Sequence, residues 1–283
     1  MVRRQAGQGV SILSVTNPYE SWAQREHTSH FGGWDRYSTR KLLRACNQFN
    51  ECQMAMELAK VAKINSVMDV GCATGRFYRF FREVFPGVDY RGLDISQVAI
   101  DHAKKLYPQT DFAVFDGDPT TAEAPQPDLL FCRDVVHHQP DPKEFLAKLY
   151  ATPSKYLLLR VRTREVGETV FDREQSCQLS YNIWVPYIVF NTQELIDLLS
   201  SYSPRPAKID IARHPDVLGG QLNRYLPKEL YFPETGTAET SILIEKGGGD
   251  QTAELKVTSE TRVETRGQEL SSLYRLAKKL ARR

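Results

Sequence analysis

One stretch constrains the fold of this chain more than any other: residues 67–77, VMDVGCATGRF. A short apolar run ends in an acid, a Gly-x-x-x-Gly turn follows, and the next segment has apolar residues at helical spacing. Strand, glycine turn and helix form the nucleotide-binding crevice at the carboxyl ends of the strands in open α/β sheets. Gly71 and Gly75 suit the turn because they lack a Cβ, tolerate positive φ and let a ligand approach the main chain.

A second acidic residue follows at the distance along the chain that is typical of a carboxylate that binds ribose. Asp94 comes about 20 residues after the turn and ends another apolar run, where a carboxylate can accept hydrogen bonds from a ribose diol. Ser96 can cap the helix that follows, and Pro108 stops it. The alternative is a solvated aspartate at a strand end.

The remaining core alternates strands with helices, which predicts a doubly wound α/β fold with a parallel sheet. Asp141, Pro142 and Glu144 together form a helix start with a capping box. Two excursions, 163–190 and 213–237, interrupt the alternation near its end. The expected strands are 66–70, 89–94, 111–115, 128–132, 156–162, 208–212 and 240–245.

Composition narrows the class of protein without choosing a function. The chain has 283 residues, 41% of them hydrophobic and 25% charged, as is ordinary for a soluble globular protein. The net charge of +2 gives no overall bias toward nucleic acid or membrane. Five cysteines without a Cys-x-x-Cys motif indicate reduced thiols and a cytoplasmic protein. No secretory signal, membrane span or cluster with metal-ligand spacing is expected, so the chemistry is predicted to need no metal.

With these motifs in place, the chain resembles the class I S-adenosylmethionine-dependent methyltransferases over about residues 60–246. Ala73 departs from the pattern, since the family often has a central glycine there, but alanine is small enough to leave the turn intact. The resemblance implies a mostly parallel seven-stranded sheet with helices on both faces and an antiparallel last strand between strands five and six. It rests on residues 69–75 (DVGCATG), 92–96 (GLDIS), 115–118 (FDGD) and 128–141 (DLLFCRDVVHHQPD).

The resemblance implies S-adenosylmethionine as cofactor and assigns residues to it. Asp69 is expected to orient the loop amides or to meet the ammonium group of the cofactor. Asp94 is expected to take the ribose hydroxyls, and Ile95 to pack on the adenine. The main chain at Gly71, Cys72 and Ala73, with Gly75 closing the turn, lines the methionine side. Ordinary turn chemistry is the alternative for each.

Two further positions follow from the same alignment. The pair Gly117-Asp118 corresponds to a common Gly-Asp pair after strand three, so Asp118 is expected to bind the adenine amino group. Asp116 competes for this role, since a slip of one residue exchanges the two acids. Arg133, directly after strand four, is expected to face the methionine moiety through its carbonyl.

His137 and His138 follow strand four, beside the expected place of the methyl acceptor. A histidine there, with an unperturbed pKa near 6.5, suits a general base for a hydroxyl or an amine. The resemblance gives an equally good alternative, because a Val-His-His pair recurs in family members with unrelated acceptors. In that case the histidines hold the loop by hydrogen bonds.

The two excursions hold the candidates for the acceptor pocket. Arginine can bind a carboxylate or phosphate through two hydrogen bonds, and the alternating Arg160 and Arg162 project to one face of their strand. We expect a small, partly aromatic or anionic acceptor, with a solvated strand end as the alternative. The candidates are Arg160, Arg162, Tyr181, Trp184, Tyr187 and Arg224.

The chain divides into three parts. Residues 1–62 are expected to form an N-terminal segment and helical cap. One helix is expected over about 38–62, and it packs over the cofactor mouth, as the resemblance implies, or merely covers a sheet edge, which is the favoured alternative. The aromatic stretch 19–37 is a candidate lid over the site. Residues 63–246 form the cofactor-binding domain. Residues 247–283 form a flexible linker and a basic amphipathic helix, which docks on an anionic membrane surface or a partner, or rests on its own domain.

The reading that the sequence favours is methyl transfer to a small molecule, with no nucleic-acid partner, because no basic nucleic-acid module is visible and the excursions suit a closed pocket. An RNA or protein methyltransferase and a non-catalytic binding protein with the same fold are the alternatives. A dinucleotide oxidoreductase would show Gly-x-Gly-x-x-Gly, but the position three after Gly75 is Tyr78, too bulky for the third glycine.

Overall fold

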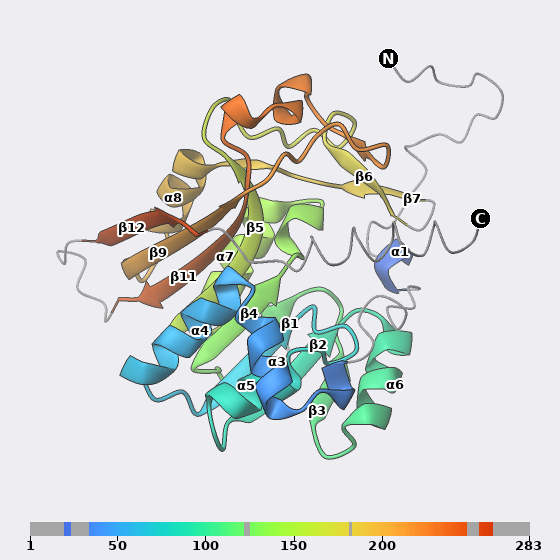
Figure 1. Cartoon of the computed structure of the whole chain (residues 1–283), viewed down its shortest axis with the longest axis vertical. Coiled ribbons are helices and arrows are strands. Elements are labelled where there is room, and N and C mark those ends of the chain that lie inside the picture. Colours follow the sequence, from blue (N-terminus) through green and yellow to red (C-terminus); the bar gives the residue numbers. More distant parts are fainter. Residues whose placement is uncertain (1–19, 24–33, 122–124, 181–182, 248–254, 263–283) are drawn as a thin grey trace.

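The computed structural model describes residues 20–23, 34–121, 125–180, 183–247 and 255–262. These residues build a nine-stranded sheet in the order β12-β9-β11-β5-β4-β1-β2-β3, with the short β8 (Phe190–Asn191) pairing with β5 (Figure 1). All seven expected strands are present in it. They are β1 (Ser66–Val70), β2 (Asp89–Asp94), β3 (Asp111–Val114), β4 (Leu129–Arg133), β5 (Tyr156–Arg164), β9 (Pro206–Pro215) and β11 (Ala238–Lys246).

The direction of the strands confirms the expected topology. β11 runs antiparallel to both of its neighbours, β5 and β9, whereas β3, β2, β1, β4 and β5 are parallel to one another. The order of the strands reverses between β1 and β4. In open α/β sheets the crevice outside the carboxyl ends of the strands at such a reversal is the usual ligand site.

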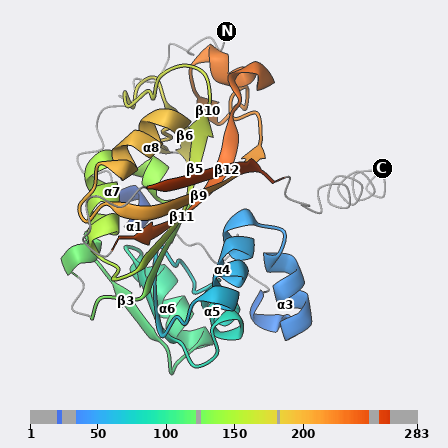
Figure 2. The ribbon, with the colours of Figure 1, turned by 90° about the vertical axis from the view of Figure 1, so that its left-hand side faces the viewer.

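Helices cover both faces of the sheet, as expected for a doubly wound fold (Figure 2). On one face α4 (Asn50–Val61), α5 (Tyr78–Val84) and α6 (Gln97–Leu106) pack on a core that includes Phe81 and Phe131. On the other face α7 (Pro142–Ala151) and α8 (Thr192–Ser200) pack on a core that includes Leu146 and Leu159. The predicted caps are present: Ser96 accepts from the Ala99 amide, and Asp141 accepts from the Glu144 amide.

The single helix expected over 38–62 is two helices, α3 (Thr39–Cys46) and α4. The break comes at residues 47–49, where Phe49 has an extended backbone. The Gln53 side-chain amide donates to the Asn47 carbonyl at 2.8 Å, so one of the carbonyls left without a helical partner at the break is satisfied. Before α3 come α1 (Glu20–Ala23) and the 3₁₀ turn η1 (Trp34–Arg36).

Residues 256–261, assigned to the linker from sequence, form β12 (Lys256–Thr261), which pairs in parallel with β9 at the sheet edge. Two residues of α4, Asn50 and Glu57, contact the residue that follows this strand. The Asn50 side-chain amide donates to the Arg262 carbonyl at 3.2 Å, and the Arg262 guanidinium pairs with Glu57. The basic helix expected near the C-terminus lies outside the described residues.

The two excursions meet in a small antiparallel sheet at the carboxyl end of the main sheet (Figure 1). It consists of β6 (Cys177–Ser180), β7 (Ile183–Pro186) and β10 (Arg224–Tyr225), followed by the 3₁₀ turns η4 (Lys228–Tyr231) and η5 (Pro233–Thr235). The Ile188 amide donates to the His137 carbonyl at 2.8 Å and so joins the first excursion to the loop after β4. None of the described helices has the length and apolar character needed to cross a membrane.

Candidate functional site

The turn after β1 has the left-handed backbone that its glycines predict. Gly71 has φ 82°, Gly75 has φ 76°, and Ala73 between them has φ 49°. A Cβ on Gly71 would lie 2.3 Å from Cγ2 of Val135, and one on Gly75 would lie 2.7 Å from the Phe112 ring. Gly71 therefore permits close approach of the loop after β4, whereas Gly75 permits packing against β3.

Asp94, at the end of β2, connects this turn to the helix that follows it. One carboxylate oxygen accepts from the Ala73 amide at 2.8 Å, and the other accepts from the Ser96 amide at 2.9 Å. A carboxylate has about four acceptor sites, so an oxygen of Asp94 can take part in more than one hydrogen bond. The left-handed conformation of Ala73 is thus coupled to the carboxylate expected to bind ribose.

Asp69 is buried at the end of β1, with 1% of its surface exposed. Its carboxylate accepts from the Tyr90 hydroxyl at 2.6 Å. Burial raises the pKa of Asp69 to about 7, although the Tyr90 hydrogen bond works in the opposite direction. Among the described residues, the Asp69 carboxylate thus contacts a hydroxyl of β2 and not the amides of the loop.

A cleft at the carboxyl ends of β1, β2 and β4 brings together many of the predicted residues. The predicted residues that line it are Asp69, Gly71, Cys72, Ala73, Asp94, Ile95, Gly117, Arg133 and His138. Sequence reasoning did not assign to this site Arg76, Phe77, Phe115, Phe131, Asp134, Val135, Gln139 and Phe145. Trp22, from the aromatic N-terminal stretch, also lines the cleft. Arg76 is the first charge after the glycine turn, a signal that could have been used.

The other predicted site residues lie outside this lining. Gly75, Asp116, Asp118, His137, Arg160, Arg162, Trp184, Tyr187 and Arg224 are not among the lining residues, and Tyr181 lies outside the described part of the chain. Trp184 lies on β7 opposite Leu179 of β6. Arg224 places its guanidinium over the Tyr187 ring, 4.6 Å from the centroid, and donates to the Leu218 carbonyl.

The two acids expected near adenine make hydrogen bonds within their own loop. Asp118 accepts from the amide and hydroxyl of Thr120 and pairs with Lys148 at 3.0 Å. Desolvation opposes the charge of Asp118, but the bonds from Thr120 and Lys148 outweigh it and lower the pKa. Asp116 accepts from the Asp118 amide at 2.9 Å. Gly117, with φ 98°, is the member of this segment that reaches the cleft.

The two histidines have different environments. His137 is buried, and its Nδ1 has no hydrogen-bond partner within the described residues. Burial, with the nearby His138 and Arg162, lowers its pKa far below the usual value, so the ring is neutral. His138 lines the cleft, and its Nδ1 lies 2.7 Å from the Pro186 carbonyl. A carbonyl can only accept, so we assign a proton to Nδ1 of His138; in the neutral form of the ring the lone pair is then on Nε2.

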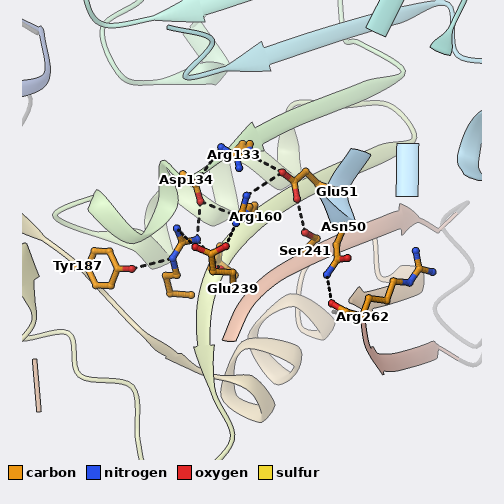
Figure 3. A network of polar contacts seen from close by, with 11 residues as sticks. Asn50, Glu51, Arg133, Asp134, Arg160, Tyr187, Glu239, Ser241 and Arg262 are labelled. Atoms are coloured by element: carbon orange, nitrogen blue, oxygen red, sulfur yellow. Dashed lines mark hydrogen bonds and ion pairs between the residues drawn. The ribbon is translucent and has the colours of Figure 1, made fainter. Parts of the chain in front are cut away.

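Beside the cleft lies a group of six charged side chains, which we call the charge cluster: Glu51, Arg133, Asp134, Arg160, Arg162 and Glu239 (Figure 3). They come from α4, from β4 and the residue after it, from β5 and from β11. Arg160 and Arg162 share one face of β5, as predicted, but this face is covered by Glu239 and by the loop carrying Asp134. Arg160 is 2% exposed, so it is not positioned to meet an acceptor.

The contacts within the charge cluster are continuous. Glu51 accepts from Arg133 at 2.6 Å and from Arg160 at 3.4 Å, and its second oxygen accepts from the Ser241 hydroxyl at 2.9 Å. Asp134, with φ 59°, contacts Arg133 at 2.9 Å and Arg162 at 2.8 Å.

Glu239 completes the charge cluster from β11. It pairs with Arg160 and, at 3.2 Å, with Arg162, whose Nε donates to the Tyr187 hydroxyl at 3.0 Å. Arg133 and Asp134 belong to both the charge cluster and the cleft lining.

The cleft lies at the topological switch point of the sheet, where open α/β folds usually bind their ligands. Residues 68–152 match the family model described as a methyltransferase domain. This match agrees with the resemblance of the chain's motifs to those of the class I S-adenosylmethionine-dependent methyltransferases.

Several solved structures are similar to the chain. One is an O-methyltransferase from a trans-AT PKS multienzyme of Brevibacillus brevis, in complex with S-adenosyl-L-homocysteine: 16% identity, 69% of this chain and 72% of that chain covered, TM-score 0.49. Another is the magnesium protoporphyrin IX methyltransferase of Synechocystis PCC 6803, with 13% identity, 72% of this chain and 82% of that chain covered, and a TM-score of 0.44. A third is phosphoethanolamine N-methyltransferase 2 of Haemonchus contortus, with 14% identity, 70% of this chain and 52% of that chain covered, and a TM-score of 0.48. No curated protein matches the chain.

Proposed function

We propose that this enzyme methylates a small-molecule acceptor that binds inside the cleft. The observation that carries the proposal is the character of the wall beside Asp94. It is mostly apolar and includes Phe77, Phe115, Phe131 and Phe145, and the centroids of the Trp22 and His138 rings, which also line the cleft, lie 4.8 Å apart. Concave, mostly apolar sites with a few polar groups are typical of small ligands.

The residues of the cleft fit the cofactor. The main chain of residues 71–73 and the Asp94 carboxylate both line the cleft, and a carboxylate at this strand end can accept hydrogen bonds from a ribose diol. We assign the ribose hydroxyls to Asp94, the adenine to Ile95 and the Gly117 main chain, and the methionine part to Asp69 and the 71–73 main chain. When bound, S-adenosylmethionine supplies a methyl carbon made electrophilic by its sulfonium.

The chain itself then has three tasks: to orient the acceptor, to exclude water and, for a hydroxyl or amine, to take up a proton. Orientation can supply about 7–11 kcal/mol of barrier reduction. We assign proton uptake to Nε2 of His138, because the Pro186 carbonyl fixes the proton on the other nitrogen. A positioned base contributes about 10²–10⁴-fold. His137 has the supporting role, since its carbonyl accepts from Ile188 and its ring is buried.

The first experiment is a screen of metabolite extracts with methyl-labelled S-adenosylmethionine, followed by mass identification of the product. We expect label in a compound of low molecular mass. Asp94→Ala should abolish the labelling, whereas His102→Ala, a change at a half-buried position of α6 outside the cleft lining, should not. Label that appears only in RNA or protein would overturn the small-molecule assignment. Cofactor binding without any transfer would favour the non-catalytic alternative.

A second experiment separates the two histidines. His138→Gln should lower turnover by about 10²–10⁴-fold with little change in the affinity for S-adenosylhomocysteine. His137→Gln should lower thermal stability instead, because it alters a buried ring. Full turnover in His138→Gln would remove this histidine from the mechanism.

The location of the protein follows from its thiols. The five cysteines are free and buried. We therefore propose a reducing, cytoplasmic environment, which expression with compartment-specific tags would test.

A further inference from the structure

The charge cluster contains three carboxylates and three guanidinium groups, so the six described side chains carry no net charge. Their burial is unusual for ions: Glu51 is 0% exposed and Arg160 is 2% exposed. Two members, Arg133 and Asp134, also form part of the cleft wall. The net charge of the cluster therefore contributes to the electrostatic potential that acts on a ligand in the cleft.

Two acids of the charge cluster, Asp134 and Glu51, are held in the ionised form by the neighbouring arginines. Burial would raise the pKa of Asp134, but Arg133, Arg162 and Arg160 outweigh burial and hold this pKa far below its usual range. For Glu51, Arg160 and Arg133 likewise overcome burial and lower the pKa. Replacing one member by a neutral side chain leaves a buried unit charge that water screens poorly. Such a charge would act over the width of the cleft.

The two ligands of a methyltransferase differ by one charge at their centres. The sulfonium of S-adenosylmethionine is positive, whereas the thioether of S-adenosylhomocysteine is neutral. We propose that the neutrality of the charge cluster sets how strongly the cleft discriminates the methyl donor from its demethylated product. Glu51, Arg160, Arg162 and Glu239 are thus specificity-determining residues that act through Arg133 and Asp134, without touching either ligand. The inference rests on the proposed cofactor site.

The size of the effect follows from Coulomb's law. For two unit charges about 10 Å apart, at an effective dielectric constant of about 20, the interaction corresponds to roughly a tenfold change in an equilibrium constant. The sign depends on which charge is removed. A cluster left with a net positive charge disfavours the sulfonium ligand, and a cluster left with a net negative charge favours it.

The test measures the dissociation constants of both ligands by isothermal titration calorimetry, for the wild-type chain and matched variants. The readout is the ratio of the constant for S-adenosylmethionine to that for S-adenosylhomocysteine. Glu239→Gln and Glu51→Gln should each raise the ratio about tenfold, and Arg162→Gln should lower it about tenfold. Ser241→Ala removes a hydroxyl that donates to Glu51 but no charge, so it should leave the ratio unchanged.

A purely structural cluster predicts a different pattern, in which both affinities fall together and the ratio stays constant in every variant. That result, or a ratio that moves the same way in Glu239→Gln and Arg162→Gln, overturns the inference. If Arg162→Gln does not fold, Arg162→Lys takes its place. This variant keeps the charge, so its ratio should equal that of wild type, whereas Glu239→Gln should still raise the ratio. Wild-type protein that binds neither ligand removes the cofactor site itself, and the inference with it.

Discussion

Asp69 offers a direct test of the electrostatics of the cleft. Burial raises its pKa from 3.8 to about 7, so the folded protein binds the Asp69 proton more tightly than the unfolded chain does. This contribution to stability is fully present below about pH 4 and is lost as the pH rises to about 7. A pKa difference of about three units corresponds to about 4 kcal/mol, since one unit is worth about 1.4 kcal/mol.

The perturbation is Asp69→Asn, which keeps the shape of the side chain and an oxygen that can accept from Tyr90 but removes the titration. The stability of the variant relative to wild type should improve by about 2–3 kcal/mol between pH 5 and pH 8, because only wild type must ionise the buried acid over this range. Urea unfolding at pH 5, 6.5 and 8 measures the difference, in which the titrations of other groups cancel.

A companion variant checks the cause of the shift. The Tyr90 hydrogen bond lowers the pKa of Asp69 against the larger effect of burial. Tyr90→Phe should therefore raise this pKa further and move the loss of stability to higher pH. Stability profiles of wild type and Asp69→Asn that run parallel from pH 5 to pH 8 would refute the reasoning, because they would show an aspartate with an ordinary pKa.

Three further changes test the geometry of the turn and the cleft. Gly75→Ala should lower the free energy of unfolding by about 2 kcal/mol or more in urea titrations, because the left-handed backbone penalises a Cβ and the Phe112 ring occupies its place. Ala73→Gly should leave stability equal or raise it by up to about 1 kcal/mol, since φ 49° is strained for alanine, and a clear loss would contradict this. Trp22→Ala should weaken cofactor binding measured by calorimetry and should leave the melting temperature within about 2 °C, because Trp22 lies in the cleft wall and outside the two main cores.

The sequence alone was sufficient to predict the features that depend on residues close together in the chain. The strands, the glycine turn and the caps at Ser96 and Asp141 each depend on neighbouring residues, and all are present. The direction of a side chain in a loop is different. Asp118 was expected at the adenine, with Asp116 as the alternative. The Asp118 side chain pairs with Thr120 and Lys148, and that of Asp116 accepts from the Asp118 amide, contacts that the spacing does not reveal.

Long-range pairing is the second kind of information that a single sequence lacks. The alternation of Arg160 and Arg162 correctly placed both on one face of β5. What covers this face comes from residues far away in the chain, Glu51 on α4 and Glu239 on β11, so two arginines expected at an acceptor are buried as ion pairs. β12 was missed for another reason: all its side chains are exposed, so no hydrophobic period marks it.

The position of Glu51 also bears on how this enzyme could be shortened. The segment that matches the methyltransferase family, residues 68–152, contains Arg133 and Asp134 but neither Glu51 nor the arginines of β5. If this segment were produced alone, Arg133 and Asp134 would lose most of their ion-pair partners and would be exposed at the wall of the cleft. A shortened chain that keeps the ion pairs of this wall must therefore include α4 before the family segment and β5 and β11 after it.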